Sequence, residues 1–334
     1  MTHTRRWGLG SWVGALVSIG VLTWLLYSYD LGELVRSLQS ASYIYLWPIP
    51  ALVVANFTVR AFRWRSLFVG GRPSRFSNFF KALMVGYLFN NLMPARAGDL
   101  IRVYHLSRHE AFSKSKILAT LFAERTGDLL ALMVLLSLVL LGYPALPLWL
   151  KRAGVLVGMV AMIAGGMVVF LKLYGEVGLT RLLRLAAPIL GDKSSRLEEI
   201  GKNFLAGLAG LFHPRIGALF LVLTAVLWGL ELGTAALIAL AFGLEIAPGN
   251  LLFVTIAIAV GTLVPSLPAY IGTFEFFGLS ALTMVGLRGG EALSFVVVLH
   301  AVTILGAGIL GALCLTRWSG AVVVRPSELR GSLE

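Results

Sequence analysis

A thirteen-residue stretch, Asn90 to Arg102, places polar and charged side chains in an otherwise strongly apolar chain. A proline and a glycine within it interrupt a helix, and Arg96, Asp99 and Arg102 supply two guanidiniums and a carboxylate. A guanidinium can donate two parallel hydrogen bonds to a phosphate. The stretch therefore predicts a broken helix that binds an anionic group. Asn90 and Asn91 either hydrogen-bond the same ligand or cap the broken helix end, and the sequence leaves both roles open.

A second charged cluster, Glu124, Arg125 and Asp128, opens a long apolar run. Glu124 and Asp128 are one helical turn apart, and Arg125 is within reach of Asp128. One interpretation is a structural ion pair at the membrane boundary. The other adds Arg96 and Arg102, so that three guanidiniums, partly neutralised by three carboxylates that include Asp99, form a pocket for an anionic headgroup.

The break has a weaker copy downstream. The Pro-Ala-x-x-Gly pattern of residues 94–98 recurs at residues 268–272, which is 174 residues later (268 − 94). Tyr270 and Glu275 lie at this copy, and Glu231 lies in the middle of an apolar run. A carboxylate at membrane depth is costly unless it is paired or hydrated, so Glu231 and Glu275 are candidate substrate-binding residues, with Tyr270 beside them.

Composition indicates a membrane protein. Hydrophobic residues make up 58% of the chain and charged residues 13%, against about 25% charged residues in soluble domains. The basic residues lie in short loops between apolar runs, so we do not expect nucleic-acid binding. A single cysteine, Cys314, allows no intrachain disulfide, and His300 has apolar neighbours that favour a packing role over metal binding. We expect no cofactor and no metal.

Apolar runs predict an all-helical, multi-pass membrane protein. A hydrocarbon core about 30 Å thick needs roughly 20 apolar residues in a helix. By this rule the chain has six full spans and two helical hairpins that contain or end at the two breaks. The spans are expected near residues 7–27, 43–62, 118–141, 153–173, 215–241 and 292–316. The hairpins contain the apolar stretches 76–93 and 250–286, and the first hairpin extends to about residue 112. The sequence does not decide whether the hairpins cross the membrane or are re-entrant.

Basic residues orient the spans, because lysine and arginine are enriched in cytoplasmic loops. Arg5 and Arg6 place the start of the chain inside, and the basic 174–214 connection and the arginines of the tail belong on the same side. We therefore expect a protein of the cell membrane with both termini in the cytoplasm. The 174–214 connection is predicted to contain an amphipathic helix at residues 195–212, on the inner surface.

This orientation makes the two halves of the chain inverted copies. The first repeat covers about residues 43–141 and the second about 215–316, within one membrane domain of residues 1–334. The 174-residue offset superimposes their spans to within a few residues. Inverted repeats with broken helices are a transporter architecture.

Three motifs together resemble the transmembrane, flippase-like domain of lysyl-phosphatidylglycerol synthases. They are the stretch from Asn91 to Arg102, the pattern Glu124-Arg125-x-x-Asp128 and the stretch from Pro265 to Glu275, and the similarity covers nearly the whole chain. The resemblance implies movement of an aminoacylated lipid across the membrane. We expect a stand-alone member without the soluble synthase domain, with a separate synthase or glycosyltransferase as a partner. Some stand-alone relatives are linked to polyprenyl-phosphate sugars, so the lipid stays open.

The resulting expectation is a flippase-like transporter that is not an enzyme. It would carry an anionic or aminoacylated phospholipid, or a lipid-linked sugar phosphate, through a polar cavity. The alternative is an integral membrane transferase that acts on a lipid-linked phosphate. Catalysis would require a placed metal or base that the sequence does not reveal. Neither the energy source nor the oligomeric state can be predicted.

Overall fold

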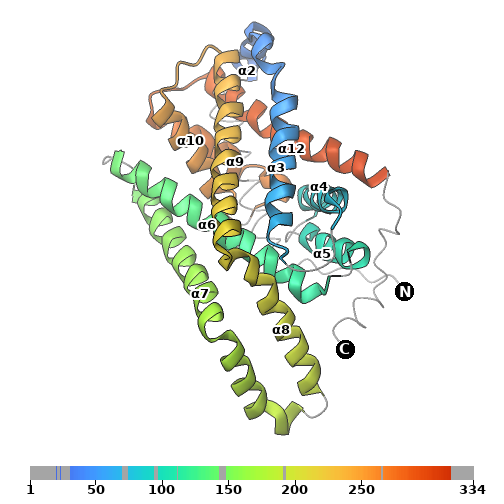
Figure 1. The fold of residues 1–334 in the computed structure, drawn as a ribbon. Coiled ribbons are helices and arrows are strands. Elements are labelled where there is room, and N and C mark those ends of the chain that lie inside the picture. The colour runs from blue at the N-terminus through green and yellow to red at the C-terminus, as the bar shows by residue number, and fades with distance from the viewer. Residues whose placement is uncertain are drawn as a thin grey trace, which may run out of the picture.

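A computed structural model describes residues 20, 23, 31–69, 74–93, 97–110, 112–142, 148–190, 193–264 and 266–316. Every regular element in these ranges is helical, which confirms the predicted all-helical fold (Figure 1). The helices are α2 (Leu31–Ser40), α3 (Ile49–Ser66), α4 (Phe76–Leu92), α5 (Gly98–His109), α6 (Lys114–Gly142), α7 (Leu148–Leu190), α8 (Lys193–Phe212), α9 (Pro214–Ala241), α10 (Pro248–Gly261), α11 (Thr273–Met284) and α12 (Gly290–Thr316). Two short 3-10 helices, η1 (Tyr43–Leu46) and η3 (Pro268–Tyr270), precede α3 and α11.

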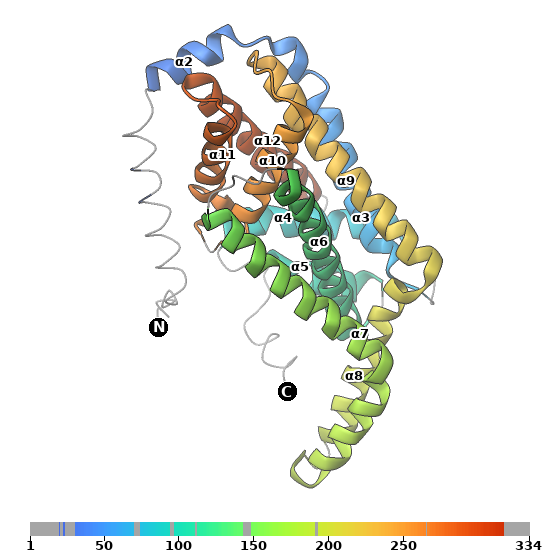
Figure 2. The same cartoon turned by 90° about the vertical axis from the view of Figure 1, so that its left-hand side faces the viewer.

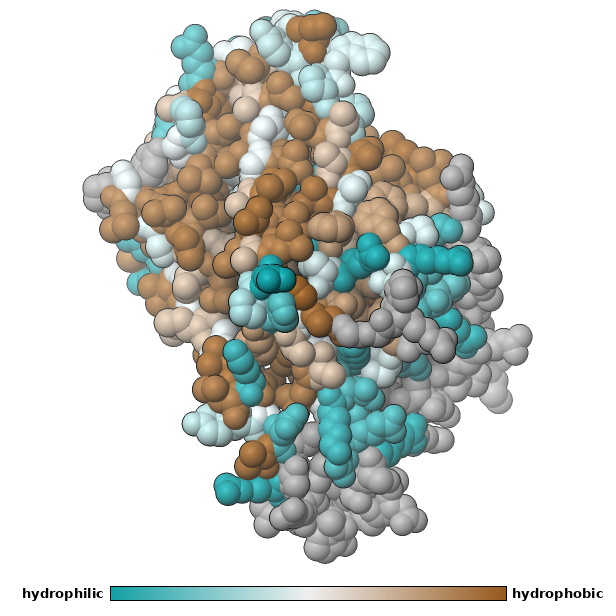
Figure 3. Space-filling model, viewed as in Figure 1, coloured by the Kyte–Doolittle hydropathy of each residue, from teal (hydrophilic) through white to brown (hydrophobic). Residues whose placement is uncertain are grey.

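Five helical segments in the described part of the chain are long and apolar enough to cross a membrane. They are Tyr43–Ser66, Lys114–Gly142, Lys151–Gly178, Pro214–Ala241 and Gly290–Thr316. Each matches a predicted span, and the remaining predicted span, 7–27, lies outside the described residues except for Gly20 and Thr23. Figure 3 shows apolar residues over α3, α6, α9 and α10, and hydrophilic residues around α5 and α8. The chain is a multi-pass membrane protein.

The described residues form two apolar cores, one mainly from the first half of the chain and one mainly from the second, and each takes in residues of the other half. The core of the first half has Trp64 and Phe79 among its fully buried residues and includes Phe220 from α9. The core of the second half is built mainly from α9 to α12, with Phe253 and Phe295 fully buried. Helices α3 and α9 run side by side in opposite directions, so they join the two cores (Figures 1 and 2).

The first predicted hairpin is formed by α4 and α5, which approach each other closely at two glycines. A Cβ atom added at Gly98 would lie 1.9 Å from the carbonyl oxygen of Gly86. The Asn90 side-chain oxygen accepts a hydrogen bond from the Gly98 N–H at 2.8 Å. This bond satisfies a backbone donor in the first turn of α5, so Asn90 has the capping role that was one of its two predicted roles.

We expect Gly98→Ala to destabilise the protein by about 1–3 kcal/mol, because overpacked side chains displace the backbone around them. The measurement is the midpoint of thermal unfolding in detergent. Gly308→Ala on α12 is the matched control, since nothing lies within 4 Å of the added Cβ atom there. Alanine also favours a helix over glycine by about 1 kcal/mol, so the control should be neutral or slightly stabilising. Equal midpoints for the two variants would contradict the close approach of α4 and α5.

Helix α7 is longer than the sequence analysis predicted. It runs for 43 residues and continues well past the predicted span 153–173 into the region interpreted as a connection. At 1.5 Å per residue it is about 64 Å long, roughly twice the thickness of the hydrocarbon core. The predicted amphipathic helix is found as α8, which packs against α7 and α6 instead of lying alone on a surface. The far ends of α7 and α8 project beyond the rest of the bundle (Figure 2).

Candidate functional site

Two arginines and a glutamate form a buried ionic centre between α3, α5 and α6. Arg63, Arg102 and Glu124 are 0%, 1% and 0% exposed. Arg102 Nη2 donates a hydrogen bond to Glu124 Oε2 at 2.8 Å, and Arg63 Nη2 lies 3.7 Å from Glu124 Oε1. The Arg102 guanidinium stacks on Trp64 at 4.1 Å and that of Arg63 on Phe220 at 4.7 Å. Glu124 can neutralise only one of the two cations, so the centre needs further carboxylates.

Asp99, Arg125 and Asp128 form a partly exposed rim around this centre. Arg63 Nη1 lies 2.7 Å from Asp128 Oδ1, and Arg102 Nη1 lies 3.7 Å from Asp99 Oδ1. Arg125 Nη2 approaches the same Asp99 oxygen at 3.4 Å. The side chains of the rim are 27–32% exposed. Centre and rim together contain three guanidiniums and three carboxylates, so this set of six is charge-balanced and presents both signs of charge at its exposed side.

Polar side chains continue from the centre along the interface of α3 and α9. Arg63 Nη1 donates a hydrogen bond to Thr224 Oγ1 at 2.8 Å. One turn earlier on α3, Arg60 forms an ion pair with Glu231, and Arg60 Nε donates to Asn56 Oδ1 at 2.8 Å. Thr224 and Glu231 are seven residues apart, so this polar track extends about 10 Å along α9. It begins at the ionic centre and ends at the ion pair of Arg60 and Glu231, whose side chains are partly exposed.

The second broken helix holds another buried polar group. His300 on α12 lies with Nδ1 2.5 Å from Glu275 Oε1 and Nε2 2.7 Å from the Ala269 carbonyl oxygen. The second oxygen of Glu275 accepts a hydrogen bond from the Gly272 N–H at 2.7 Å. The side chains of His300 and Glu275 are 6% and 13% exposed. The pair therefore connects α11 and α12 to the turn that contains Tyr270.

The structure brings most of the predicted site residues into two groups. Asp99, Arg102, Glu124, Arg125 and Asp128 lie together at the ionic centre and its rim, and Asn90 Nδ2 lies 3.5 Å from Asp99 Oδ1. Asn91 lies in the last turn of α4 and is partly exposed. Tyr270 and Glu275 belong to the second group, and Arg96 lies outside the described residues.

Five polar side chains of these networks were not predicted as site residues, namely Asn56, Arg60, Arg63, Thr224 and His300. The sequence analysis placed the basic residues in short loops between apolar runs and did not distinguish Arg60 and Arg63, near the end of the second span, from the others. Their spacing contained a signal that was not used, since Asn56, Arg60 and Arg63 recur at intervals of four and three on one helical face.

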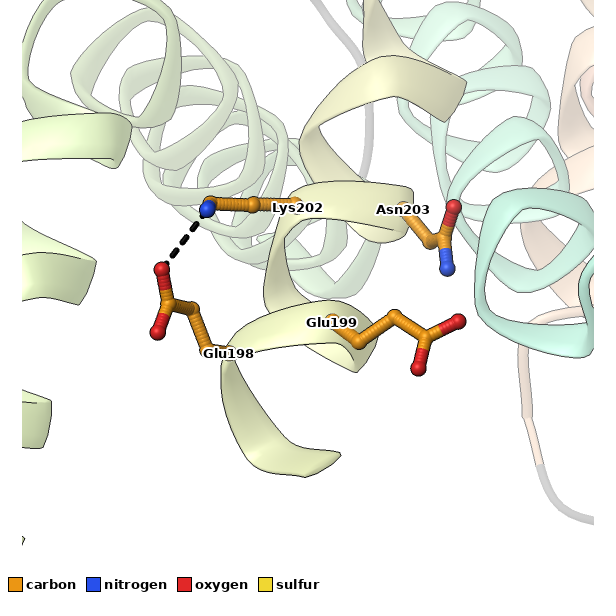
Figure 4. A pocket seen from close by; sticks show the side chains of 4 residues that line it. All are labelled: Glu198, Glu199, Lys202 and Asn203. Atoms are coloured by element: carbon orange, nitrogen blue, oxygen red, sulfur yellow. Dashed lines mark ion pairs between the residues drawn. The ribbon is translucent and has the colours of Figure 1, made fainter. Parts of the chain in front are cut away.

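A shallow hollow of about 470 Å³ lies on α8, lined by Glu198, Glu199, Lys202 and Asn203 (Figure 4). Glu198 Oε1 lies 2.6 Å from Lys202 Nζ, and this hydrogen bond raises the pKa of Lys202. All four lining residues come from one exposed helix, so the hollow offers no converging groups for a ligand. Within the described ranges, no three histidine, cysteine or acidic side chains are close enough together to hold a metal ion.

Comparisons with known proteins give a family and a curated relative for this chain. The family model described as "Lysylphosphatidylglycerol synthase TM region" matches residues 11–311. A curated relative, glycosyltransferase AglD of Haloferax volcanii, is 24% identical over 86% of this chain and 51% of its own length. The chain therefore spans about half the length of that relative. No solved structure matches the chain.

Proposed function

Since the chain belongs to the lysylphosphatidylglycerol synthase TM region family, we propose that it is a flippase-like transporter of lipid headgroups. Its substrate would be an anionic or aminoacylated phospholipid, or a lipid-linked sugar phosphate. The observation that carries the proposal is the ionic centre with its rim, set in a bundle of candidate membrane spans. Charged side chains inside membrane bundles are costly, and they usually mark the path of a substrate or ion.

The exposed side of this group suits a headgroup that carries both signs of charge. The Arg125 guanidinium would bind a phosphate, while the carboxylates of Asp99 and Asp128 would bind an ammonium group. Because the six charges balance, they favour a zwitterionic or aminoacylated headgroup over a purely anionic one. In addition, the buried Nε atoms of Arg63 and Arg102 donate no hydrogen bond to any described residue. Such donors are costly to leave unmet, so an oxygen from a bound headgroup or water would stabilise them.

The predicted inverted repeat supports transport by alternating access. Under the 174-residue offset α3 corresponds to α9, the hairpin α4–α5 to α10–α11, and α6 to α12. Helix α4 packs against α12, and α6 packs against α10, as a two-fold relation between the halves requires. We propose that rocking of one repeat against the other exposes the polar groups to each side of the membrane in turn.

The same proposal places the protein in the plasma membrane with its termini in the cytoplasm. The hydrophilic end formed by α5 and α8 (Figure 3) would face the cytoplasm, because the sequence of these helices and of the start of α6 is rich in lysine and arginine.

A membrane transferase that acts on a lipid-linked phosphate is the second candidate function. It is favoured by the name of the relative, a glycosyltransferase, although this chain matches only about half of that protein. Under the transport proposal the same relationship points to a lipid-linked sugar as one candidate cargo, made by a separate glycosyltransferase.

The test is lipid movement in proteoliposomes that hold a fluorescent headgroup-labelled lipid, followed with a membrane-impermeant quencher. An aminoacyl-phosphatidylglycerol, phosphatidylglycerol and a polyprenyl-phosphate sugar would be assayed in parallel. We expect at least one of them to cross faster than in protein-free vesicles, with its headgroup chemically unchanged in mass spectrometry. A transferred or hydrolysed headgroup would favour the transferase, and equal rates with and without protein for all three lipids would reject transport of these lipids.

A further inference from the structure

Glu275 and His300 form a buried acid–base pair that the proposed headgroup site does not use. The two residues come from the hairpin helix α11 and the long helix α12 of the second half. Together with the carbonyl oxygen of Ala269 and the N–H of Gly272, they form a closed set of hydrogen bonds at the break.

The partners fix the number of protons in this set. A carbonyl oxygen can only accept, so the hydrogen bond to Ala269 requires a proton on His300 Nε2. The 2.5 Å contact between His300 Nδ1 and Glu275 Oε1 requires a second proton, carried either by the imidazole or by the carboxyl group. Without it, the lone pair of Nδ1 would face a carboxylate. The pair therefore holds one proton that it can release.

We propose that Glu275 and His300 bind the proton that couples lipid movement to a proton gradient. This inference rests on the proposed transport function and adds its energy source. In the cycle, water on one side of the membrane would supply the proton to the pair, and the pair would release it to water on the other side. Both side chains are nearly buried, so exchange with water requires the bundle to open.

The pair is mechanically linked to the break itself. Ala269 and Tyr270 have positive φ angles of 61° and 63°, a conformation that side-chain-bearing residues rarely adopt. His300 holds the carbonyl of Ala269, and Glu275 holds the N–H of Gly272, whose φ is 93°. Loss of the proton would turn the contact between Nδ1 and the carboxylate into a repulsive one. The strained turn would then lose its support, so proton occupancy and the shape of the break are coupled.

Glu275 and His300 interact electrostatically mainly with each other. His300 is the ionisable group that acts most strongly on Glu275, and the imidazole stacks on Phe274 at 4.1 Å. Helix α10 carries no titratable side chain, and α12 has Glu291 at its start. The turn η3 itself carries Tyr270. Apart from helix ends and the ionic centre, the other elements packed against α11, α12 and η3 carry Lys81 and Tyr87 on α4, Arg60 on α3, Glu231 on α9, and Glu33 and Arg36 on α2. Arg60 and Glu231 neutralise each other.

The corresponding place in the first half carries a pair that cannot serve this role. Under the 174-residue offset, Arg102 and Glu124 correspond to positions 276 and 298, within two residues of Glu275 and His300. Each pair joins the second limb of a hairpin to the next long helix. Arginine keeps its proton in proteins, whereas histidine exchanges one near neutral pH. In the first half the hairpin carries the cation, Arg102, which keeps its charge, whereas in the second half the hairpin carries the carboxylate and the long helix carries the titratable His300.

The experiment measures how a pH gradient distributes labelled lipid in proteoliposomes whose membrane potential is clamped. If one proton moves with each lipid, a difference of one pH unit shifts the leaflet ratio by about tenfold. We expect this shift for the wild type, and we expect it to be absent in His300→Gln and Glu275→Gln. His213→Gln is the matched control, because His213 is exposed at the start of α9, and it should behave as the wild type. Thermal unfolding in detergent identifies a variant that fails to fold.

A measurement on the wild type alone keeps the proposal testable if both variants unfold. Nitrogen NMR of labelled histidine reports protonation of both ring nitrogens, and infrared spectroscopy reports a protonated carboxyl group. We expect one of these two signals at neutral pH, and the absence of both would overturn the proton site. If the wild type moves lipid but the leaflet ratio ignores the gradient, the coupling is wrong and the transport function stands. If the wild type moves no lipid, the transport function fails, and the coupling fails with it even where the pair is protonated.

Discussion

Replacing Glu124 with glutamine is expected to destabilise the protein by about 3–5 kcal/mol, because removal of one partner leaves buried charges uncompensated. Glutamine has nearly the shape of glutamate, so packing at the ionic centre is kept and only the charge is lost. The loss is large because Glu124 lies between two guanidiniums that are themselves buried. The measurement is the shift in the unfolding midpoint in detergent.

Two further variants separate the charge from other causes. Glu199→Gln, on the exposed face of α8, is the matched control and should change stability by less than about 0.5 kcal/mol. Glu124→Gln combined with Arg102→Met should recover part of the loss, because it removes one of the stranded cations together with its partner. An unfolding midpoint for Glu124→Gln equal to that of the wild type would show that the ionic centre is not closed in the membrane-embedded protein.

Sequence analysis could predict only some of the contacts of the ionic centre and its rim. Glu124 and Asp128 are one turn apart on the same helix, so their proximity follows from helical geometry alone. Arg63 lies more than 60 residues earlier on α3, and its contacts with both carboxylates arise from helix packing. The sequence contained the charge and the spacing of this arginine but no signal for its partners. For that reason the predicted group lacked Arg63, which contacts both carboxylates in the structure.

His300 illustrates a similar limit. Its neighbours along α12 are apolar, and on this basis the sequence analysis assigned it a packing role. The residue is buried as expected, and both ring nitrogens are hydrogen-bonded to groups from the preceding hairpin, Glu275 and the carbonyl of Ala269, which the sequence analysis did not identify as partners. A periodicity argument describes one helix at a time. It therefore does not identify a partner from another segment, here a turn with positive φ angles that packs against α12.

The spans were predicted well because their cause is local. A run of apolar residues of sufficient length forms a membrane helix whatever its neighbours are. The rule did not predict the far end of α7. The chain beyond residue 173 contains charges and was interpreted as a connection, but it is helical. The helix continues there because α8 packs along it, with Gly175 close enough that an added Cβ atom would lie 2.5 Å from the Leu205 side chain. The hydropathy of a single helix does not predict which other helix packs against it.

Arg125→Gln is expected to reduce lipid movement by about tenfold or more while leaving the fold intact. A hydrogen bond to a charged group contributes about 1.5–3 kcal/mol, and this variant removes the guanidinium that is best placed to bind a phosphate at the rim. Its effect on stability should be small, about 0–1 kcal/mol, because Arg125 is one-third exposed and its ion pair with Asp99 is long at 3.4 Å. The assay is the proteoliposome measurement with whichever lipid the wild type moves.

Arg125→Lys should lose less than Arg125→Gln, because lysine keeps the charge but not the planar fork that donates two parallel hydrogen bonds. Arg196→Gln on the exposed surface of α8 is the control for removal of a guanidinium, and it should move lipid at the wild-type rate. The unfolding midpoint and the transport rate together distinguish a ligand of the headgroup from a structural partner of Asp99. Replacement of a structural partner would lower both, whereas replacement of a headgroup ligand would lower the transport rate alone, in the order given for the two Arg125 variants. If Arg125→Gln is as stable as the wild type and moves lipid equally fast, the rim of the ionic centre does not bind the headgroup.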